Sequence, residues 1–545
     1  MRMSFYERLS ALDQSFLAFE TPNAYMHVAL TAIFESGSLA TAQGGVDIER
    51  IRRHIAARLK LLPRYRQRLL YTPVMSDAVW VDDDAFDLGY HVRHASLPRP
   101  GGERQLQRRC AEILERPLDR RRPLWEMWVI EGLSEGCFAL LAKVHHCMVD
   151  GIAGVELLAA TLGTEPCETL EPIEPWAPRP LPSDRELFTD EVRRRTRASI
   201  GLVSDVRRAL GTPASAGRAL GQRATALVRV LTQIGGAPST PFNQPIGPHR
   251  RIDWLAMDMA AIKEIRTRLG GTVNDVVLTT VAGAVGRFLT RRGARLDGQF
   301  RTVVPVNVRA VDEQGALGNR VSVWLTALPV HQPDARRRHA MVSAMTARLK
   351  ADQDAMGAEL MMQAAEWTTA SIINLAVQFI NRARRFNLIV TNVPGPPVPF
   401  YLLSARMVAG YPHLPLFENQ GLGVALFSYG GQLYWGVAAD WNQMPDLSDF
   451  MADVAESFAE LRAAAGSTAL PVAASSAAPP PAGGGHLRVH RTAAVIPSAA
   501  AGGARGTSGR TRAVSAADGL RPAVPAPRLA TARASRSTGQ SDGRR

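Results

Sequence analysis

CFALLAKVHHCMVDG, residues 137–151, is the most informative stretch of this chain. Its apolar first half is typical of a buried strand, in which successive side chains point to opposite faces of a sheet. If the strand extends through both histidines, His145 shares a face with Lys143, while His146 shares the other face with Val144. The two imidazoles then point apart, which disfavours a shared metal ion, and the sequence offers no third ligand nearby. One histidine can therefore be catalytic and the other structural.

The residues after the histidine pair suit general base catalysis. A neutral imidazole at the end of a strand can take a proton from a hydroxyl or thiol and accelerate a reaction by about 10²- to 10⁴-fold. His146 is the candidate base, and the alternative is that both histidines are only packed and hydrogen-bonded. Asp150 and Gly151 follow in the predicted turn. Asp150 precedes the helical pattern GIAGVELLAATL, so it is either an N-cap worth about 1 kcal/mol or an electrostatic brace for the turn.

The flanking sequence predicts a mixed α/β fold in two halves. In the first half, LWEMWVIEGL, a turn at 134–136 and CFALLAKVHH predict a β-hairpin, preceded by a helix around 106–114. The second half opens with helices on either side of TVNDVVLTTVAGAV. Strands are predicted there at RTVVPVNVR, FNLIVTNV, LGVALFSY and QLYWGVAAD.

The net charge of the 545 residues is +14, but it is concentrated in two segments. Residues 466–545 carry +9 and residues 192–235 carry +8, so the remaining chain is slightly acidic and no nucleic-acid partner is expected. Residues 466–545 are mostly Ala, Gly, Pro, Ser, Thr and Arg, which predicts a disordered basic tail; a shifted reading frame in GC-rich DNA yields similar text. The Arg-rich linker at 191–250 is interpreted as a crossover between domains at 1–190 and 251–465.

The crossover is also the segment whose sequence most clearly indicates binding to a membrane surface. Its apolar and arginine residues are compatible with an amphipathic helix on an anionic membrane surface, or with a solvated linker helix. Glu7 and Asp13 interrupt any signal peptide, and no run of about 18 apolar residues could span a bilayer. Four cysteines without a CxxC pair favour a reducing compartment. We therefore expect a cytoplasmic protein that is peripherally associated with membranes.

Other motifs narrow the chemistry. The sequence lacks a G-x-S-x-G elbow, a phosphate-binding G-x-x-x-x-G-K-[ST] loop and a G-x-G-x-x-G turn after a strand, so acyl-enzyme chemistry is disfavoured. Cys147 adjoins the candidate base, but we interpret it as a small buried residue rather than a nucleophile. TVNDVVL at 272–278 places two polar residues before an apolar helix. Taken alone, this indicates helix capping by Asn274 or Asp275.

At these residues the chain resembles the bacterial wax ester synthase/diacylglycerol acyltransferase family, within the CoA-dependent acyltransferases of chloramphenicol-acetyltransferase-like fold. The resemblance covers roughly residues 4–462. It rests on LSALDQSFLAFETPNAYMHV, LPRYRQRL, WVDDDAFDLGYHVRH, RPLWEMWVIEGL, HHCMVDG, TVNDVVL, VPVNVRA, LGNRVS and NLIVTNVPGP. Condensation domains of nonribosomal peptide synthesis share HHxxxDG, and the PLWE and ND elements narrow the choice.

The resemblance implies two similar domains, each a mixed β-sheet with flanking helices, that meet along a channel with the histidine loop in the middle. It further implies direct transfer from long-chain acyl-CoA, a substrate rather than a cofactor, to diacylglycerol or a long-chain alcohol, with no metal. His146 would deprotonate the acceptor hydroxyl. Asn274 would stabilise the oxyanion, a term worth about 3 to 4 kcal/mol, or position His146. Asp150 would hold the loop by pairing with Arg309.

Partners implied by this reading are an anionic membrane surface at the inner face of the plasma membrane, or a lipid droplet. Two alternatives stay open. One is a condensation-type acyltransferase that works on carrier-protein thioesters, and the other is a non-catalytic lipid-binding member of the fold.

Overall fold

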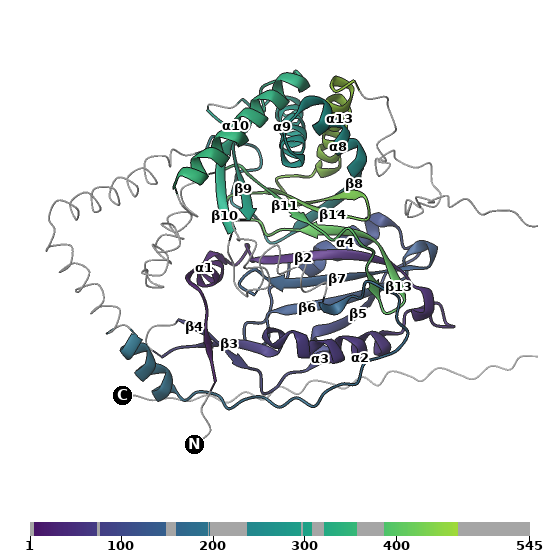
Figure 1. The fold of residues 1–545 in the computed structure, drawn as a ribbon, viewed down its shortest axis with the longest axis vertical. Coiled ribbons are helices and arrows are strands. Elements are labelled where there is room, and N and C mark those ends of the chain that lie inside the picture. The colour runs from purple at the N-terminus through teal and green to yellow at the C-terminus, as the bar shows by residue number, and fades with distance from the viewer. Residues whose placement is uncertain are drawn as a thin grey trace, which may run out of the picture. The chain divides into compact units, whose positions relative to one another are not determined.

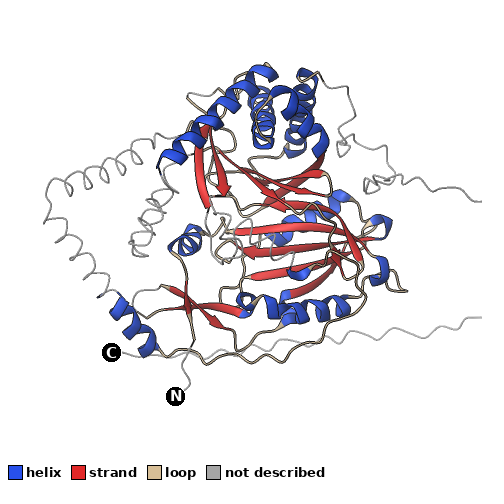
Figure 2. Cartoon of the chain, viewed as in Figure 1, coloured by secondary structure: helices blue, strands red, loops and turns tan. Residues whose placement is uncertain are grey.

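The computed structural model describes residues 5–73, 77–148, 160–194, 196, 237–295, 298–307, 321–356 and 386–466. These residues belong to one compact unit. The tail predicted at 466–545, apart from its first residue, lies outside the described residues, as does most of the Arg-rich crossover at 191–250. The described part is a mixed α/β fold of three sheets with flanking helices, which confirms the fold class (Figures 1 and 2).

The first large sheet contains the histidine strand. Its strands are, in spatial order, β12 (Tyr401–Leu402), β13 (Ala405–His413), β2 (His27–Glu35), β7 (Cys137–His145), β6 (Trp125–Glu131) and β5 (Val92–Ser96). The β6 and β7 strands form the predicted antiparallel hairpin, and only β5 pairs in parallel, with β6. Every residue of β7 is buried, as expected for a central strand with apolar side chains on both faces.

Helices cover both faces of this sheet. They are α2 (Ile48–Arg58), the short α3 (Leu88–His91) and α4 (Glu103–Leu114), which confirms the helix predicted around 106–114. Figure 1 shows α2 and α3 on the side away from the second large sheet and α4 on the side toward it. On α4, Leu106, Cys110 and Ile113 recur at helical spacing and pack into the same core as the strands.

The second large sheet has the order β10 (Val321–Ala327), β9 (Arg301–Asn307), β11 (Leu388–Pro394), β14 (Leu422–Tyr429), β15 (Gln432–Asp440) and β8 (Arg250–Asp258). Four of these strands match the predicted ones. One face is covered by α8 (Met259–Leu269), α9 (Val273–Arg291), α10 (Ala335–Met356) and α13 (Leu447–Ala464) (Figure 1). Because α9 is buried along most of its length, it forms the centre of this core.

A small third sheet adjoins the amino terminus. It consists of β1 (Glu7–Arg8), β4 (Ala78–Asp82) and β3 (Gln67–Tyr71), and β1 leads into helix α1 (Ala11–Phe19). Short 3₁₀ turns complete the first half, namely η1 (Gly37–Leu39), η2 (Leu59–Leu61), η3 (Pro63–Arg66) and η4 (Ser134–Gly136). No helix in the described part of the chain is long and apolar enough to cross a membrane.

Strand β13 joins the two halves of the chain. It follows β11 in sequence, yet it pairs with β2 in the first sheet, with Tyr411 opposite Thr31. The second sheet approaches it closely, because a Cβ on Gly436 of β15 would lie 1.7 Å from the carbonyl oxygen of Pro412. The Tyr411 ring also stacks on Trp254 of β8, with centroids 4.6 Å apart. The halves therefore share a strand in addition to a packed interface.

Buried polar contacts cross the same interface. Gln107 on α4 donates a hydrogen bond to Asp253 on β8 over 2.9 Å, and Thr31 Oγ1 lies 2.8 Å from Nε2 of His413. Burial raises the pKa of Asp253 to about 6. Because buried polar groups are costly without partners, these contacts specify how the halves register against each other.

Candidate active site

The two histidines lie where β7 ends. His145 is the last residue of the strand and pairs with His27 of β2, while His146 begins a turn. The alternation of side chains between the two faces of the sheet therefore stops at His145. The direction of each imidazole ring is given by the residues that the ring contacts. Lys143 shares the face of His145, as predicted. Its buried ammonium donates to the carbonyl oxygens of Ile113 and Arg116 at the end of α4, and burial lowers its pKa to about 8.

Both ring nitrogens of His145 are engaged. Its Nδ1 accepts a hydrogen bond from the main-chain N–H of Cys147 over 3.1 Å, and its Nε2 lies 3.1 Å from Oε1 of Glu20. An accepting Nδ1 places the proton on Nε2, facing the carboxylate. With its side chain 1% exposed, Nδ1 hydrogen-bonded and Nε2 beside a carboxylate, His145 has the character of the structural histidine of the pair.

Glu20 is a residue that the sequence reasoning missed. It follows α1 and accepts hydrogen bonds from the main-chain N–H of Met26 over 3.0 Å and from Arg120 over 2.7 Å. Burial alone would raise its pKa, but contact with His145 and Arg120 outweighs burial and lowers the pKa to about 2. Glu20 is therefore ionised at neutral pH. Nearby His27 stays neutral, because burial and then the charge of Lys143 hold its pKa well below the usual range.

His146 occupies a different environment from its neighbour. Its main-chain N–H donates to the carbonyl oxygen of Met26 over 2.8 Å, and its ring stacks on Phe16 of α1 with centroids 3.9 Å apart. Phe16 in turn packs against an apolar cluster from both halves of the chain: Ala24, Met26, Ile246, Leu416 and Ala438. The residue is half-buried, and a neutral imidazole in this position can accept a proton from a bound hydroxyl.

Cys147 is buried, in agreement with its interpretation as a core residue. It is 4% exposed and packs in a cluster with Leu9, Leu17, Leu69, Ala78, Trp80, Leu118 and Leu124. Burial, followed by the charges of Asp13 and Glu20, raises the pKa of its thiol well above the ordinary value. Because the thiolate is the reactive form, this cysteine is a poor nucleophile at neutral pH.

Asn274 is the second residue of α9. The N-cap is Thr272, which forms a capping box with Asp275, so Asp275 takes part in the cap and Asn274 does not. The side-chain oxygen of Asn274 instead accepts a hydrogen bond from Asn392 on β11 over 3.1 Å. Asn392 was missed by the sequence reasoning, although an asparagine inside the apolar strand FNLIVTNV was a usable signal.

Asp150, Gly151 and Arg309 lie outside the described residues. The predicted pairing of Asp150 with Arg309, and the turn formed by Asp150 and Gly151, remain predictions. Among the described side chains, no three His, Cys, Asp or Glu residues form a group that could hold a metal ion.

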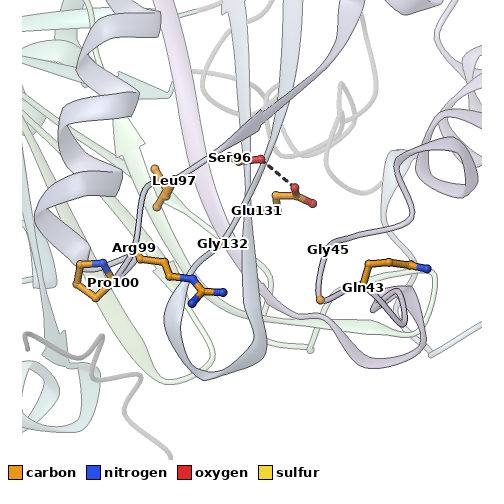
Figure 3. Close-up of a pocket in the computed structure, with 9 residues that line it drawn as sticks. Gln43, Gly45, Ser96, Leu97, Arg99, Pro100, Glu131 and Gly132 are labelled. Atoms are coloured by element: carbon orange, nitrogen blue, oxygen red, sulfur yellow. Dashed lines mark hydrogen bonds between the residues drawn. The ribbon is translucent and has the colours of Figure 1, made fainter. Parts of the chain in front are cut away.

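Two hollows in the described part of the chain lie away from the rings of His145 and His146. A small cavity of about 30 Å³ adjoins His27 at the interface of the halves, and its lining includes Arg250 and His413. A wide hollow of about 860 Å³ lies at the opposite end of the β6–β7 hairpin, beside Glu131 and Ser96 (Figure 3). In that hollow the Ser96 hydroxyl donates to Glu131 over 2.8 Å. Neither His145 nor His146 lines either hollow.

Comparison with known proteins gives consistent matches along the chain. Residues 9–277 match the wax ester synthase/diacylglycerol acyltransferase catalytic domain, and residues 317–462 match the WS/DGAT C-terminal domain. A Mycobacterium tuberculosis protein that carries the name of a diacylglycerol O-acyltransferase is 33% identical over 459 residues, which cover 81% of this chain and 87% of the relative. A Mycobacterium bovis protein with the same kind of name is 31% identical over 458 residues, which cover 83% of this chain and 95% of that protein.

Solved structures extend the comparison. The wax ester synthase/diacylglycerol acyltransferase from Marinobacter aquaeolei VT8 superimposes with a TM-score of 0.63 and 25% identity, and the match covers 84% of this chain and all of that one. A starter condensation domain of rhizomide synthetase matches with a TM-score of 0.51 and 12% identity, over 86% of this chain and 96% of that one. At that identity the second match indicates a shared fold alone.

Proposed function

This chain belongs to the wax ester synthase/diacylglycerol acyltransferase family and is an acyltransferase, and we propose that it makes triacylglycerol by transferring an acyl group from long-chain acyl-CoA to diacylglycerol. Long-chain alcohols are proposed as a second acceptor, giving wax esters. The names of the mycobacterial relatives support diacylglycerol as acceptor, and the Marinobacter enzyme supports the alcohol. In the proposed reaction acyl-CoA is a substrate, and the reaction uses no cofactor and no metal.

His146 is the proposed general base. The observation that carries this assignment is the contrast between the two histidines: His145 is buried, with Nδ1 hydrogen-bonded to Cys147 and Nε2 3.1 Å from the Glu20 carboxylate, whereas His146 is only half-buried at the turn. His146 takes the acceptor proton as the hydroxyl oxygen attacks the thioester carbonyl carbon. When the tetrahedral intermediate collapses, the C–S bond breaks and the proton passes to the leaving CoA sulfur.

Two further roles complete the proposed mechanism. Asn274 donates a hydrogen bond to the oxyanion or positions His146, and the hydrogen bond from Asn392 supports this role because it orients the Asn274 amide. Asp150 is proposed to brace the turn by pairing with Arg309, and Gly151 is the next residue of this proposed turn. The family match over residues 9–277, which contain HHxxxDG, supports the role of Asp150, and Arg309, outside that match, is proposed because it ends the stretch VPVNVR.

We further propose that the enzyme works at an anionic membrane surface or lipid droplet, where its acceptors reside. The net charge of +8 in residues 192–235 supports attraction to anionic lipid, with about 1 kcal/mol per cationic side chain near the surface. No nucleic-acid partner is proposed.

The test is thiol release from palmitoyl-CoA by the full chain, with diacylglycerol or hexadecanol supplied. We expect acceptor-dependent release that is lost in His146→Ala and kept in His94→Ala, a histidine on β5 at the other end of the sheet. Equal turnover of His146→Ala and wild type would remove His146 from the mechanism. No release with either acceptor would contradict the proposed substrates and favour the carrier-dependent or non-catalytic alternatives.

A further inference from the structure

The carboxylate of Glu20 collects contacts from three separate parts of the first half. Oε1 accepts from the main-chain N–H of Met26 and faces Nε2 of His145 at 3.1 Å, while Oε2 accepts from Arg120 over 2.7 Å. Arg120 also donates to the carbonyl oxygen of Leu17 at the end of α1. Negative charge at a helix C-terminus is unfavourable for the helix itself. The contacts of Glu20, rather than the stability of α1, therefore account for a carboxylate here.

One of these contacts selects the tautomer of His145. The main-chain N–H of Cys147 points at Nδ1 over 3.1 Å, which requires a lone pair on that nitrogen. The proton must then sit on Nε2, and Glu20 is the acceptor that faces it. Without the carboxylate, a buried Nε2–H would lose the negative charge that lies 3.1 Å away, and the opposite tautomer would set two N–H groups against each other at Cys147.

The same carboxylate is linked to each of the groups that fix the position of the His146 ring. The main-chain N–H of His146 is held by Met26, whose own N–H is held by Glu20. The residue after His146 donates to His145, whose ring faces Glu20. The ring itself stacks on Phe16 of α1, the helix that ends next to Glu20. Displacing the carboxylate would loosen all three supports together.

We propose that Glu20 is a positioning residue for His146, acting through the tautomer of His145 and the turn at residues 146–148. The inference rests on the proposed function, because it assigns the task of positioning the proposed base. A misplacement of about 1 Å can lower turnover about 100-fold, so the effect belongs in kcat rather than in substrate binding.

The test compares Glu20→Gln with Glu131→Gln. Glu131 is a matched control at the far end of the hairpin: its carboxylate also accepts from a main-chain N–H, that of Val46, and contacts a histidine, His94. We expect Glu20→Gln to lower kcat for acceptor-dependent thiol release about 10- to 100-fold with little change in KM for palmitoyl-CoA. Glu131→Gln should keep the wild-type kcat.

The second readout is the tautomer of His145 in ¹⁵N-histidine-labelled protein, with the signal assigned by its loss in His145→Gln. We expect a proton on Nε2 in the wild type and a mixture in Glu20→Gln. If Glu20→Gln does not fold, Glu20→Asp is the second variant. It keeps the negative charge on a side chain that is one methylene shorter, so the His145 tautomer and kcat should change less than expected for Glu20→Gln.

Three outcomes decide the inference. A wild-type kcat in Glu20→Gln overturns it, and so does an unchanged His145 tautomer. Equal losses of kcat in Glu20→Gln and Glu131→Gln would indicate a general loss of structure and also overturn it. If the wild type transfers no acyl group, the proposed function fails, while the tautomer spectra still decide whether Glu20 holds His145 and the turn.

Discussion

We expect replacement of Asp275 by alanine to lower mainly the stability of the fold, and replacement of the adjacent Asn274 to lower mainly the turnover. Asp275 is 2% exposed and accepts hydrogen bonds from the main-chain N–H of Thr272 and the hydroxyl of Thr346, both over 2.7 Å. Losing one helix-cap bond costs about 1 kcal/mol, and losing the bond from Thr346, whose hydroxyl keeps the carbonyl oxygen of Ser343 at 3.1 Å as an acceptor, costs about 1 kcal/mol more. Asp275→Ala should thus lower the free energy of unfolding by about 2 kcal/mol.

Asn274→Ala removes one partly buried hydrogen bond, from Asn392, and should cost about 1 kcal/mol. Its turnover should fall at least about 100-fold if it supplies an oxyanion donor. Urea unfolding followed by tryptophan fluorescence, together with thiol release per folded molecule, separates the two effects. Thr272→Ser is the control that keeps the cap. Stable Asp275→Ala protein, or an Asn274→Ala enzyme with normal turnover, would refute the division of labour.

Three further predictions concern acid stability, the interface and thiol access. The pKa of Glu20 is lowered to about 2, so its contribution to the free energy of unfolding is present above about pH 4.5 and is lost as the pH falls toward 2. In acid titrations, the difference in stability between wild type and Glu20→Gln should therefore close over that range. Gly436→Ala places a Cβ 1.7 Å from Pro412 oxygen and should destabilise the fold by about 1 to 3 kcal/mol, seen as a lower thermal midpoint. A thiol reagent should label exposed Cys167 alone in the native protein, and rapid labelling of buried Cys147 would contradict this.

Strands with local signals were predictable from the sequence. The β6–β7 hairpin combines two apolar runs with a short turn, where Gly132 and Gly136 adopt positive φ. The strands β14 and β15 are likewise largely apolar runs, since both of their faces are buried. The histidine pair was located because it ends such a run, and the assignment of one catalytic and one structural histidine stays a prediction.

Features that depend on distant segments were not predictable. The residues of β13 include Gly410 and Pro412, which weaken a strand pattern, and their partner β2 lies near the other end of the chain. Phe16 lies on α1 and Glu20 directly follows that helix, early in the sequence, and only the fold brings them to His145 and His146. Of the two capping candidates at the start of α9, Asp275 takes part in the capping box, but the N-cap itself is Thr272, which the sequence analysis did not single out.

The shared strand bears on how substrates reach His146. Strand β13 belongs to the second half by sequence, but Met407 and residues 409–413 of it pair with β2, and β2 pairs in turn with β7. After β13 the chain brings Leu416 to the cluster that contains Met26 and Phe16, beside the His146 ring. Rigid separation of the halves would break both a strand ladder and this cluster. Access to the base at low energetic cost therefore has to come from local movement of loops and side chains, with the two sheets staying paired through β13.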